Sequence, residues 1–298
     1  MMSVLDHGII EWSFEMNVTR AITRYLPDSL YLKIQYYYHF KRLPNLRNPK
    51  TFNEKLQWLK LHDHNPLYTT MVDKVKVKDY VASKIGEKYI IQTLGIWERA
   101  EDINFGSLPE QFVIKCNHDS HGVIVCKDKS KLDVEDTRRR LGKRLANNGY
   151  SYGREWPYKN VERRILAEQF IKDDSGELID YKIHCFNGEP KFVLICQDRF
   201  SKTGLKEDFY DLSWKVMDVK RPNVEHGAPI SKPASFDKML ELSRTLSKGV
   251  PFLRVDFYYT QGEILFGELT LFPASGFQRF VPEYYDRLFG DWIELPKK

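Results

Sequence analysis

Polar and apolar residues alternate in two segments near the end of the chain, 252–259 (FLRVDFYY) and 263–272 (EILFGELTLF). Because successive side chains of a β-strand point to opposite faces, this alternation predicts two strands, each with one polar face. We expect a turn of odd length centred on Gly262, because a slip of one residue would move Glu268 to the apolar face. That register opposes Arg254 to Thr270, Asp256 to Glu268, Leu253 to Leu271, Val255 to Leu269, and Phe257 to Gly267.

The opposed carboxylates of Asp256 and Glu268 make the polar face of this hairpin a candidate metal site. Two like charges directly across a strand pair repel each other unless a cation lies between them. Arg254 supplies part of that charge, and Mg²⁺ is commonly held by one or two carboxylates together with phosphate oxygens and water. A salt-bridge patch on an exposed sheet face is the alternative interpretation.

The rest of the pattern predicts an α/β fold of the α+β type, with mainly antiparallel strands in the second half. Thr51 followed by Glu54 is a capping-box pattern at a helix start. We divide the chain into a helical segment 1–65, a first subdomain 66–166 and a second subdomain 167–298. Beyond the hairpin we expect a polar tail. Helices are expected to residue 65, from Tyr68 to Gly86, at 133–148 and at 235–249. Strands are expected at 88–98, 111–117, 122–128, 164–172, 178–186 and 191–199, the last three in one antiparallel sheet and joined by turns at 173–177 and 187–190.

Composition limits the compartment and the partners. The 298 residues are 42% hydrophobic, as in folded globular proteins, and no apolar run approaches the ~18–20 residues of a membrane-spanning helix. The N-terminus lacks the pattern of a secretory signal, and the four cysteines lack metal-binding spacing. We therefore expect a cytoplasmic protein with buried, reduced thiols. The net charge of +5 is modest and well mixed, which argues against nucleic acid as a partner.

One basic cluster lies within the expected helix 133–148. Such a run is usually a solvated helix face, and the alternative is a role in holding an anionic substrate. Its members are Arg138, Arg139, Arg140, Lys143 and Arg144.

Two upstream segments have features of a nucleotide site. Lys115 ends an expected strand, and the backbone N–H groups of the loop after it, which contains Ser120 and Gly122, could cover a polyphosphate. The loop lacks the GK[ST] sequence and precedes a strand, so it is not a Walker-type loop. In the run ILAEQFI, the backbone near Glu168 and Gln169 could face an adenine edge, although any buried strand has a similar pattern.

These segments occur in the order of the ATP-grasp fold, and the chain resembles the TupA-like ATP-grasp proteins, which are found among capsule, teichuronopeptide and other surface-polysaccharide genes. The resemblance extends from about Leu30 to the end and includes NPKTFNEKLQWLKL ahead of the ATP-grasp part. Its specific element is the pattern R-V-D, then G-E-x-[NT] and P, in LRVDFY and FGELTLFPASG; Asp73-Lys74, FVIKCNHDSHG, ILAEQFI and DYKIHCFNGEPKFV support it. The resemblance implies two α+β subdomains that clamp ATP, preceded by a helical segment.

The resemblance also implies a role for each matching position. Asp119 and His121 occupy loop positions where glycine is common in the family, and Thr270 stands in place of the usual Asn. The implied roles are ATP phosphate contacts for Lys74, Lys115, Ser120, His121 and Gly122, hinge contacts to adenine for Glu168, Gln169 and Ile171, Mg²⁺ ligation for Asp256, Glu268 and Thr270, a phosphate or substrate contact for Lys182, and binding of the acyl phosphate or tetrahedral intermediate for Arg254.

The implied function is an ATP- and Mg²⁺-dependent carboxylate–amine ligase. Its family setting suggests that an amino acid or other amine is joined to the carboxylate of a uronic-acid-containing glycan, with peripheral membrane association left open. Two alternatives stand beside it. A glycosyltransferase would need a nucleotide-sugar site, commonly with a D-x-D motif, and the sequence contains no D-x-D triplet. A glycan-binding protein with a decayed ATP site is the other alternative.

Overall fold

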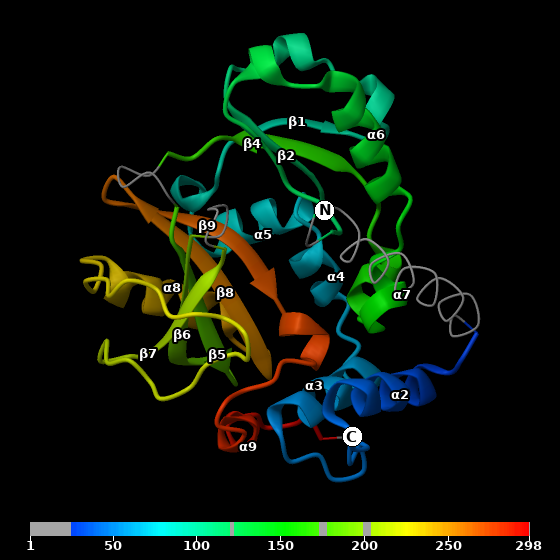
Figure 1. Ribbon diagram of the computed structural model, residues 1–298, viewed down its shortest axis with the longest axis vertical. Helices are drawn as coiled ribbons and strands as arrows, with labels where there is room; N and C mark the ends of the chain where they lie inside the picture. The colour runs from blue at the N-terminus through cyan, green and yellow to red at the C-terminus, as the bar shows by residue number, and fades with distance from the viewer. Residues whose placement is uncertain (1–24, 120–121, 173–177, 199–203, 298) are drawn as a thin grey trace, which may run out of the picture.

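The computed structural model describes residues 25–119, 122–172, 178–198 and 204–297, which form two antiparallel sheets with helices around them (Figure 1). The strands are β1 (Thr93–Trp97), β2 (Phe112–Cys116), β3 (Ile124–Cys126), β4 (Ile165–Gln169), β5 (Asp180–Phe186), β6 (Glu189–Gln197), β7 (Lys206–Asp211), β8 (Phe252–Thr260) and β9 (Glu263–Thr270). The helices are α2 (Asp28–Phe40), α3 (Phe52–His62), α4 (Leu67–Val72), α5 (Lys76–Ile85), α6 (Val134–Leu145), α7 (Gly149–Gly153), α8 (Phe236–Ser247) and α9 (Tyr284–Asp291). The predicted α+β class is confirmed.

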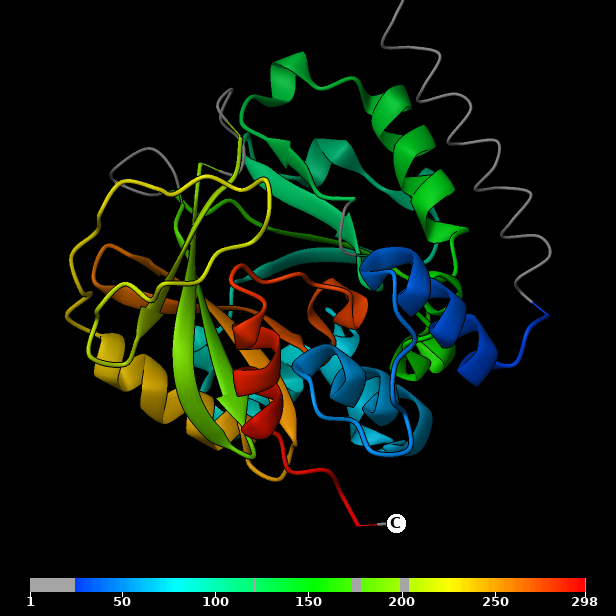
Figure 2. The same cartoon turned by 60° about the horizontal axis from the view of Figure 1, so that its bottom comes forward.

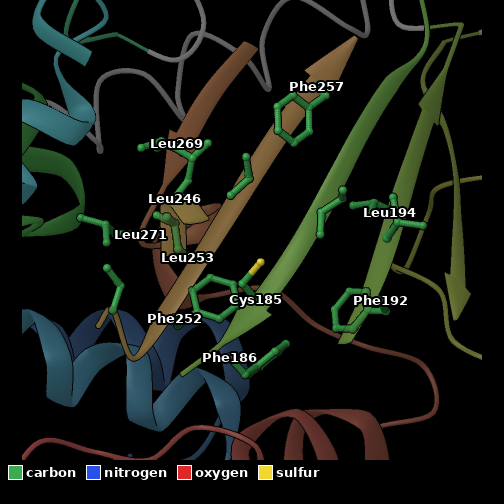
Figure 3. Packing of buried hydrophobic residues seen from close by; sticks show 14 of the residues in the cluster. Cys185, Phe186, Phe192, Leu194, Leu246, Phe252, Leu253, Phe257, Leu269 and Leu271 are labelled. Carbon is green, nitrogen blue, oxygen red and sulfur yellow. The ribbon is translucent and has the colours of Figure 1, made fainter. Parts of the chain in front are cut away.

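The larger sheet has the strand order β7-β6-β5-β8-β9 and carries the main core. Helix α8 packs on one face, where Leu246 lies among Leu253, Leu269 and Leu271 (Figure 3). Helices α3 and α9 cover part of the other face, as Figure 2 shows. The ring of Phe52 in α3 lies 4.9 Å from that of Phe252 in β8.

That second face changes from apolar to charged along β8. Phe252 is covered by α3, and Arg254 and Asp256 follow on the same side of the strand because side chains alternate. The larger sheet therefore buries one end of this face in the core and presents polar groups at the other end.

The smaller sheet has the order β1-β4-β2-β3, and α6 packs against it (Figure 1). Leu141 of α6 is fully buried in a second core cluster with Ile114 of β2 and Ile165 of β4. This gives the sheet its own hydrophobic core. The three strand runs from 164 to 199 are thus not one sheet: β4 belongs to the smaller sheet, and β5 and β6 belong to the larger one. The predicted boundary at residue 167 falls inside β4. The turn predicted at 173–177 lies outside the described residues.

The start of α3 has the predicted capping box, in which Thr51 and Glu54 exchange side-chain to backbone hydrogen bonds. The single helix expected from Tyr68 to Gly86 is wrong, because the chain breaks between α4 and α5. At the break, Asp73 Oδ1 accepts from the backbone N–H of Val75 (2.9 Å) and from Nδ2 of Asn117 (2.8 Å). A partner 44 residues away in sequence leaves no signal in local periodicity.

The hairpin β8–β9 has the predicted register where its polar residues lie. The β9 strand ends at Thr270, so Leu253 and Leu271 lie outside the paired ladder. The confirmed pairs are Arg254 with Thr270, Val255 with Leu269, and Asp256 with Glu268.

The turn of this hairpin differs from the prediction. It consists of two residues, Gln261 and Gly262, both in the left-handed region (φ 51° and 80°), as two-residue hairpin turns of type I′ require. A bulge next to Asp256 then shifts the pairing by one residue, so that Phe257 pairs with Phe266 and not with Gly267. The odd turn predicted from the polar pattern was wrong, and the bulge is what brings the polar residues back into register.

The residues after the hairpin are not a polar tail. They form α9, whose Phe289 stacks on Phe192 of β6 with ring centroids 4.6 Å apart. The four cysteines are buried thiols, as predicted. Over the described residues, no helix combines the length and the apolar character that a membrane span requires.

Candidate functional site

Charged side chains from both sheets and from the α4–α5 break converge between the two sheets. On the smaller sheet, Glu168 of β4 forms ion pairs with Lys115 of β2 and with Lys78 of α5, the latter at 2.7 Å. Although burial favours the neutral acid, the two lysines hold the pKa of Glu168 below its usual value. This carboxylate therefore fixes two ammonium groups side by side on the smaller sheet.

On the larger sheet, Asp256 is the centre of a buried charge cluster. Its carboxylate accepts from Arg254 through Nε (2.6 Å) and Nη2 (2.7 Å), and from Lys182 of the neighbouring strand β5. Burial alone would raise the pKa of Asp256, but Arg254 and Lys182 lower it to about 2. Burial disfavours the charge of Lys182 too, yet Asp256 and Asp180 hold its pKa above the usual value.

Glu268, opposite Asp256, is the carboxylate of this cluster that solvent reaches. Its side chain is 35% exposed, against 2% for Asp256. Oε1 accepts from Arg254 Nη2 at 2.8 Å, and Thr270 Oγ1 lies 3.4 Å from the same oxygen. Burial and Asp256 raise the pKa of Glu268, but Lys74 and Arg254 outweigh them and lower it. Glu268 and Thr270 thus form the accessible edge of the cluster.

Lys74 connects the two halves of this charge arrangement. It lies in the α4–α5 break, where its backbone N–H donates to the carbonyl oxygen of Asn117 at 3.1 Å. Its Nζ is 3.9 Å from Glu268 Oε2, and burial lowers its pKa against the pull of Glu268. Because Asn117 directly follows β2, the hydrogen bond ties Lys74 to the smaller sheet while its ammonium faces the larger one.

The remaining positions assigned by the resemblance are placed less completely. Ser120 and His121 lie outside the described residues. Gly122 precedes β3, and Gln169 is the last residue of β4, with Ile171 just beyond it. The backbone of Glu168 pairs with β1 on one side and with β2 on the other, and the side chain of Glu168 contacts Lys78 and Lys115. The hinge contacts to adenine stay predictions.

Lys78 and Asn117 belong to this site and escaped the sequence prediction. Lys78 lies four residues after Lys74, a spacing that would place both on one side of the single helix expected from Tyr68 to Gly86 and could have indicated Lys78. Asn117 is fully buried, and its amide bonds to Asp73, to the carbonyl of Glu162 and to the N–H of Arg164. Nothing in the local pattern around Asn117 distinguishes it from an ordinary loop residue.

Lys60 of α3 was also missed and borders the same region. Its Nζ donates to Gln57 Oε1 (3.0 Å) and to the carbonyls of Gly153 and Ser275 (2.7 Å each). Burial lowers the pKa of Lys60 to about 8, and the nearby Glu155 acts in the opposite direction. Glu155 in turn accepts a hydrogen bond from Ser275 Oγ.

This lysine holds a strained segment that follows the β9 strand. Ala274 and Ser275 both have left-handed backbones (φ 46° and 52°), a conformation that costs on the order of 1–3 kcal/mol per non-glycine residue. Such strain persists only where surrounding contacts fix it, and the two carbonyls of Ser275 and Gly276 accept from Lys60 and Gln57. The segment begins four residues beyond Thr270.

The arrangement suits binding of a phosphate-rich ligand with a divalent metal. Within the described ranges, no three His, Cys, Asp or Glu side chains gather as a metal site. Mg²⁺ does not need one, since it takes one or two carboxylates plus phosphate oxygens and water. Lysines from the smaller sheet and carboxylates from the larger one meet this requirement together.

A family model described as TupA-like ATPgrasp matches residues 54–294. A comparison with curated proteins found no match. The match to the family model covers both sheets, the α4–α5 break and the charge cluster, and it confirms the fold that the resemblance implied.

Solved structures of ATP-grasp ligases are similar at low identity. A D-alanine–D-alanine ligase from Bacillus anthracis complexed with ATP is 17% identical over 68% of this chain and 54% of that chain, with a TM-score of 0.40. An L-amino acid ligase from Bacillus licheniformis is 14% identical over 89% of this chain and 61% of that chain, with a TM-score of 0.47. This chain thus spans little more than half the length of these two ligases.

Proposed function

The chain belongs to the TupA-like ATP-grasp family, and from that premise we propose that it is an ATP- and Mg²⁺-dependent carboxylate–amine ligase. One observation carries the proposal. Lys74, held by the smaller sheet, lies opposite Glu268 of the larger sheet, so that cations for a polyphosphate and carboxylates for a metal lie close together between the two sheets. This arrangement of cations and carboxylates fits a metal–nucleotide complex better than it fits the metal or the nucleotide alone.

The donor set fits Mg²⁺ at Glu268. This carboxylate is the accessible one, and among the residues that the structure describes, its Oε2 has an ion-pair contact only with Lys74, at 3.9 Å. Both oxygens of Asp256 already accept from Arg254, and Lys182 also donates to Oδ2. Asp256 would therefore join the metal only as Lys182 turns toward a phosphate oxygen, with Thr270 as a weaker neighbouring ligand.

The nucleotide supplies a phosphoryl group to a substrate carboxylate, giving ADP and an acyl phosphate, which an amine then converts to an amide with release of phosphate. Such chemistry needs positioned charge more than a protein nucleophile. Lys115 and Lys74 would bind phosphate oxygens, and Glu168 would keep Lys115 in place. Arg254, fixed by Asp256, would neutralise the acyl phosphate and the charge that develops when the amine adds.

The substrates we propose are an amino acid or other amine and the carboxylate of a uronic-acid-containing glycan, used in the cytoplasm for surface or capsular polysaccharide. Family membership supports this choice of substrates. The modest net charge of +5 agrees with an acidic small molecule or glycan bound at a local site.

The direct test is a screen of amino acids with uronosyl oligosaccharides for ADP release, followed by E268A in the productive combination. We expect E268A to lower turnover roughly 10²–10³-fold, because it removes the accessible metal ligand. E263A is the matched control, since Glu263 is an exposed glutamate at the start of the same strand. Wild-type turnover in E268A would show that the metal assignment is wrong.

A further inference from the structure

Four basic residues of helix α6, Arg139, Arg140, Lys143 and Arg144, line a pocket of about 310 Å³. The spacing of the four residues puts them on one face of the helix, and β3 forms the facing wall. The volume is at the lower end of small-molecule sites, which are roughly 300–1,000 Å³. The residues around the pocket are Gly122, Ile124, Arg139, Arg140, Lys143, Arg144 and Asn147.

The pocket has more positive than negative charge. Asp136 pairs with Arg139 and, at 3.9 Å, with Arg140, while Asp119 pairs with Arg144 at 3.0 Å. Lys143 has no ion pair with any residue in the described part of the chain. Four cations thus face two carboxylates. The negative end of the α6 dipole offsets part of this excess, because the helix ends at Leu145.

One residue that lines the pocket, Gly122, is the last residue of the loop that the resemblance assigns to the ATP phosphates. Gly122 packs so closely that a Cβ there would lie 2.6 Å from Asp119 Oδ2 and 3.4 Å from the Arg144 side chain. Asp119 also acts electrostatically on Lys74, as its effect on the pKa of that lysine shows. The pocket therefore adjoins the proposed reaction site and is separate from its metal ligands.

We propose that this pocket binds carboxylates of the acidic glycan acceptor, at sugar units next to the one that reacts. The inference deepens the proposed function and rests on it. Guanidinium groups pair with carboxylates in a two-point geometry, and Arg139 and Arg140 are exposed enough to do so. Ile124 and Asn147 add an apolar and an amide surface suited to a sugar ring and its hydroxyls. The small charge excess suits a few spaced carboxylates better than a dense polyphosphate.

The test measures binding of tetragalacturonate by calorimetry at low ionic strength. The pocket variant is R140Q/K143Q, whose side chains are exposed, so folding should be preserved. The control variant is K238Q/R287Q, which removes the same charge from α8 and α9. We expect binding to weaken about tenfold or more in the pocket variant and to stay unchanged in the control. The carboxyl-reduced, neutral tetrasaccharide should not bind measurably.

Two results would overturn the assignment. One is that the pocket variant and the control variant bind tetragalacturonate with equal affinity, or that neither variant binds it. The other is a pocket-dependent affinity for tripolyphosphate that exceeds the affinity for tetragalacturonate. Stabilisation by Mg²⁺–ATP is measured on the same proteins and should be equal in all of them. Its absence would count against the ligase itself, whereas loss of glycan binding alone counts only against the pocket.

Discussion

Among single residues, Asp256 carries the electrostatic balance of the cluster on the larger sheet. The carboxylate is 2% exposed and is neutralised by Arg254 and Lys182 together. The two cations keep its pKa at about 2, compared with an ordinary value of 3.8, so the folded state favours the ionised form. Stability from this group is present above the ordinary pKa and is lost as the pH falls through the folded one.

We predict that protonation of Asp256 lowers the free energy of unfolding of the wild-type protein by about 2 kcal/mol between about pH 4 and pH 2. The D256N variant should lack this pH-dependent loss. Urea unfolding at several pH values in this window measures the difference. D237N is the control, since Asp237 is 83% exposed. A D256N curve parallel to that of the wild type would contradict the assigned pairing.

At the residue scale, sequence alternation predicted which side chains share the polar face of the hairpin, because a face is fixed by the strand period alone. The same pattern could not indicate that Lys182 pairs with Asp256, or that Lys60 reaches Ser275. Those contacts depend on strand order and on helix placement, which local periodicity does not contain.

Among the elements, the α4–α5 break is what presents Lys74 to the cluster. Asn117 holds this break, since it bonds to Asp73, Glu162 and Arg164 while being fully buried. We predict that N117A lowers the free energy of unfolding by about 2–3 kcal/mol, because several buried polar groups lose partners. It should also reduce stabilisation by Mg²⁺–ATP, because Lys74 is no longer fixed.

The matched control is N148A, which removes one exposed helix cap and should cost about 1 kcal/mol or less. Chemical denaturation and nucleotide-dependent melting of both variants provide the measurement. If N117A unfolded like N148A and kept the full response to nucleotide, the break would not position Lys74.

Lys60 makes a second element-scale prediction. K60M removes three hydrogen bonds to oxygens on three segments and should lower the free energy of unfolding by about 2–4 kcal/mol. Denaturant unfolding measures this change. K84M, an exposed lysine of α5, is the control and should change stability by less than about 0.5 kcal/mol. Equal stability of the two variants would show that Lys60 does not hold the left-handed segment.

The elements themselves were largely predictable, and their assembly was not. The hairpin strands and the capped helix α3 follow from period and capping residues. The two-residue turn at Gln261 and Gly262 was missed because the bulge at Gly267 gives the same polar face as an odd turn. β4 was placed in the wrong sheet because chain order does not fix which strands pair.

For the whole molecule, we infer that the charged region between the two sheets binds a metal–nucleotide. A ligand that binds only the folded state raises its stability by about 2.7 kcal/mol at a hundred times its Kd. For a chain of this size that corresponds to a rise of several degrees in Tm. The nucleotide brings negative phosphates to Lys74 and Lys115, and the metal neutralises Glu268, so each should strengthen binding of the other.

The decisive measurement for binding of a metal–nucleotide is therefore thermal unfolding with ATP and Mg²⁺ together, with each alone, and with a nucleotide sugar. We predict a rise in Tm with Mg²⁺–ATP that is much larger than with ATP in chelator, with most of the metal-dependent part lost in E268A and retained in E263A. No shift with Mg²⁺–ATP, together with a shift from the nucleotide sugar, would contradict the ligase and favour a glycosyltransferase.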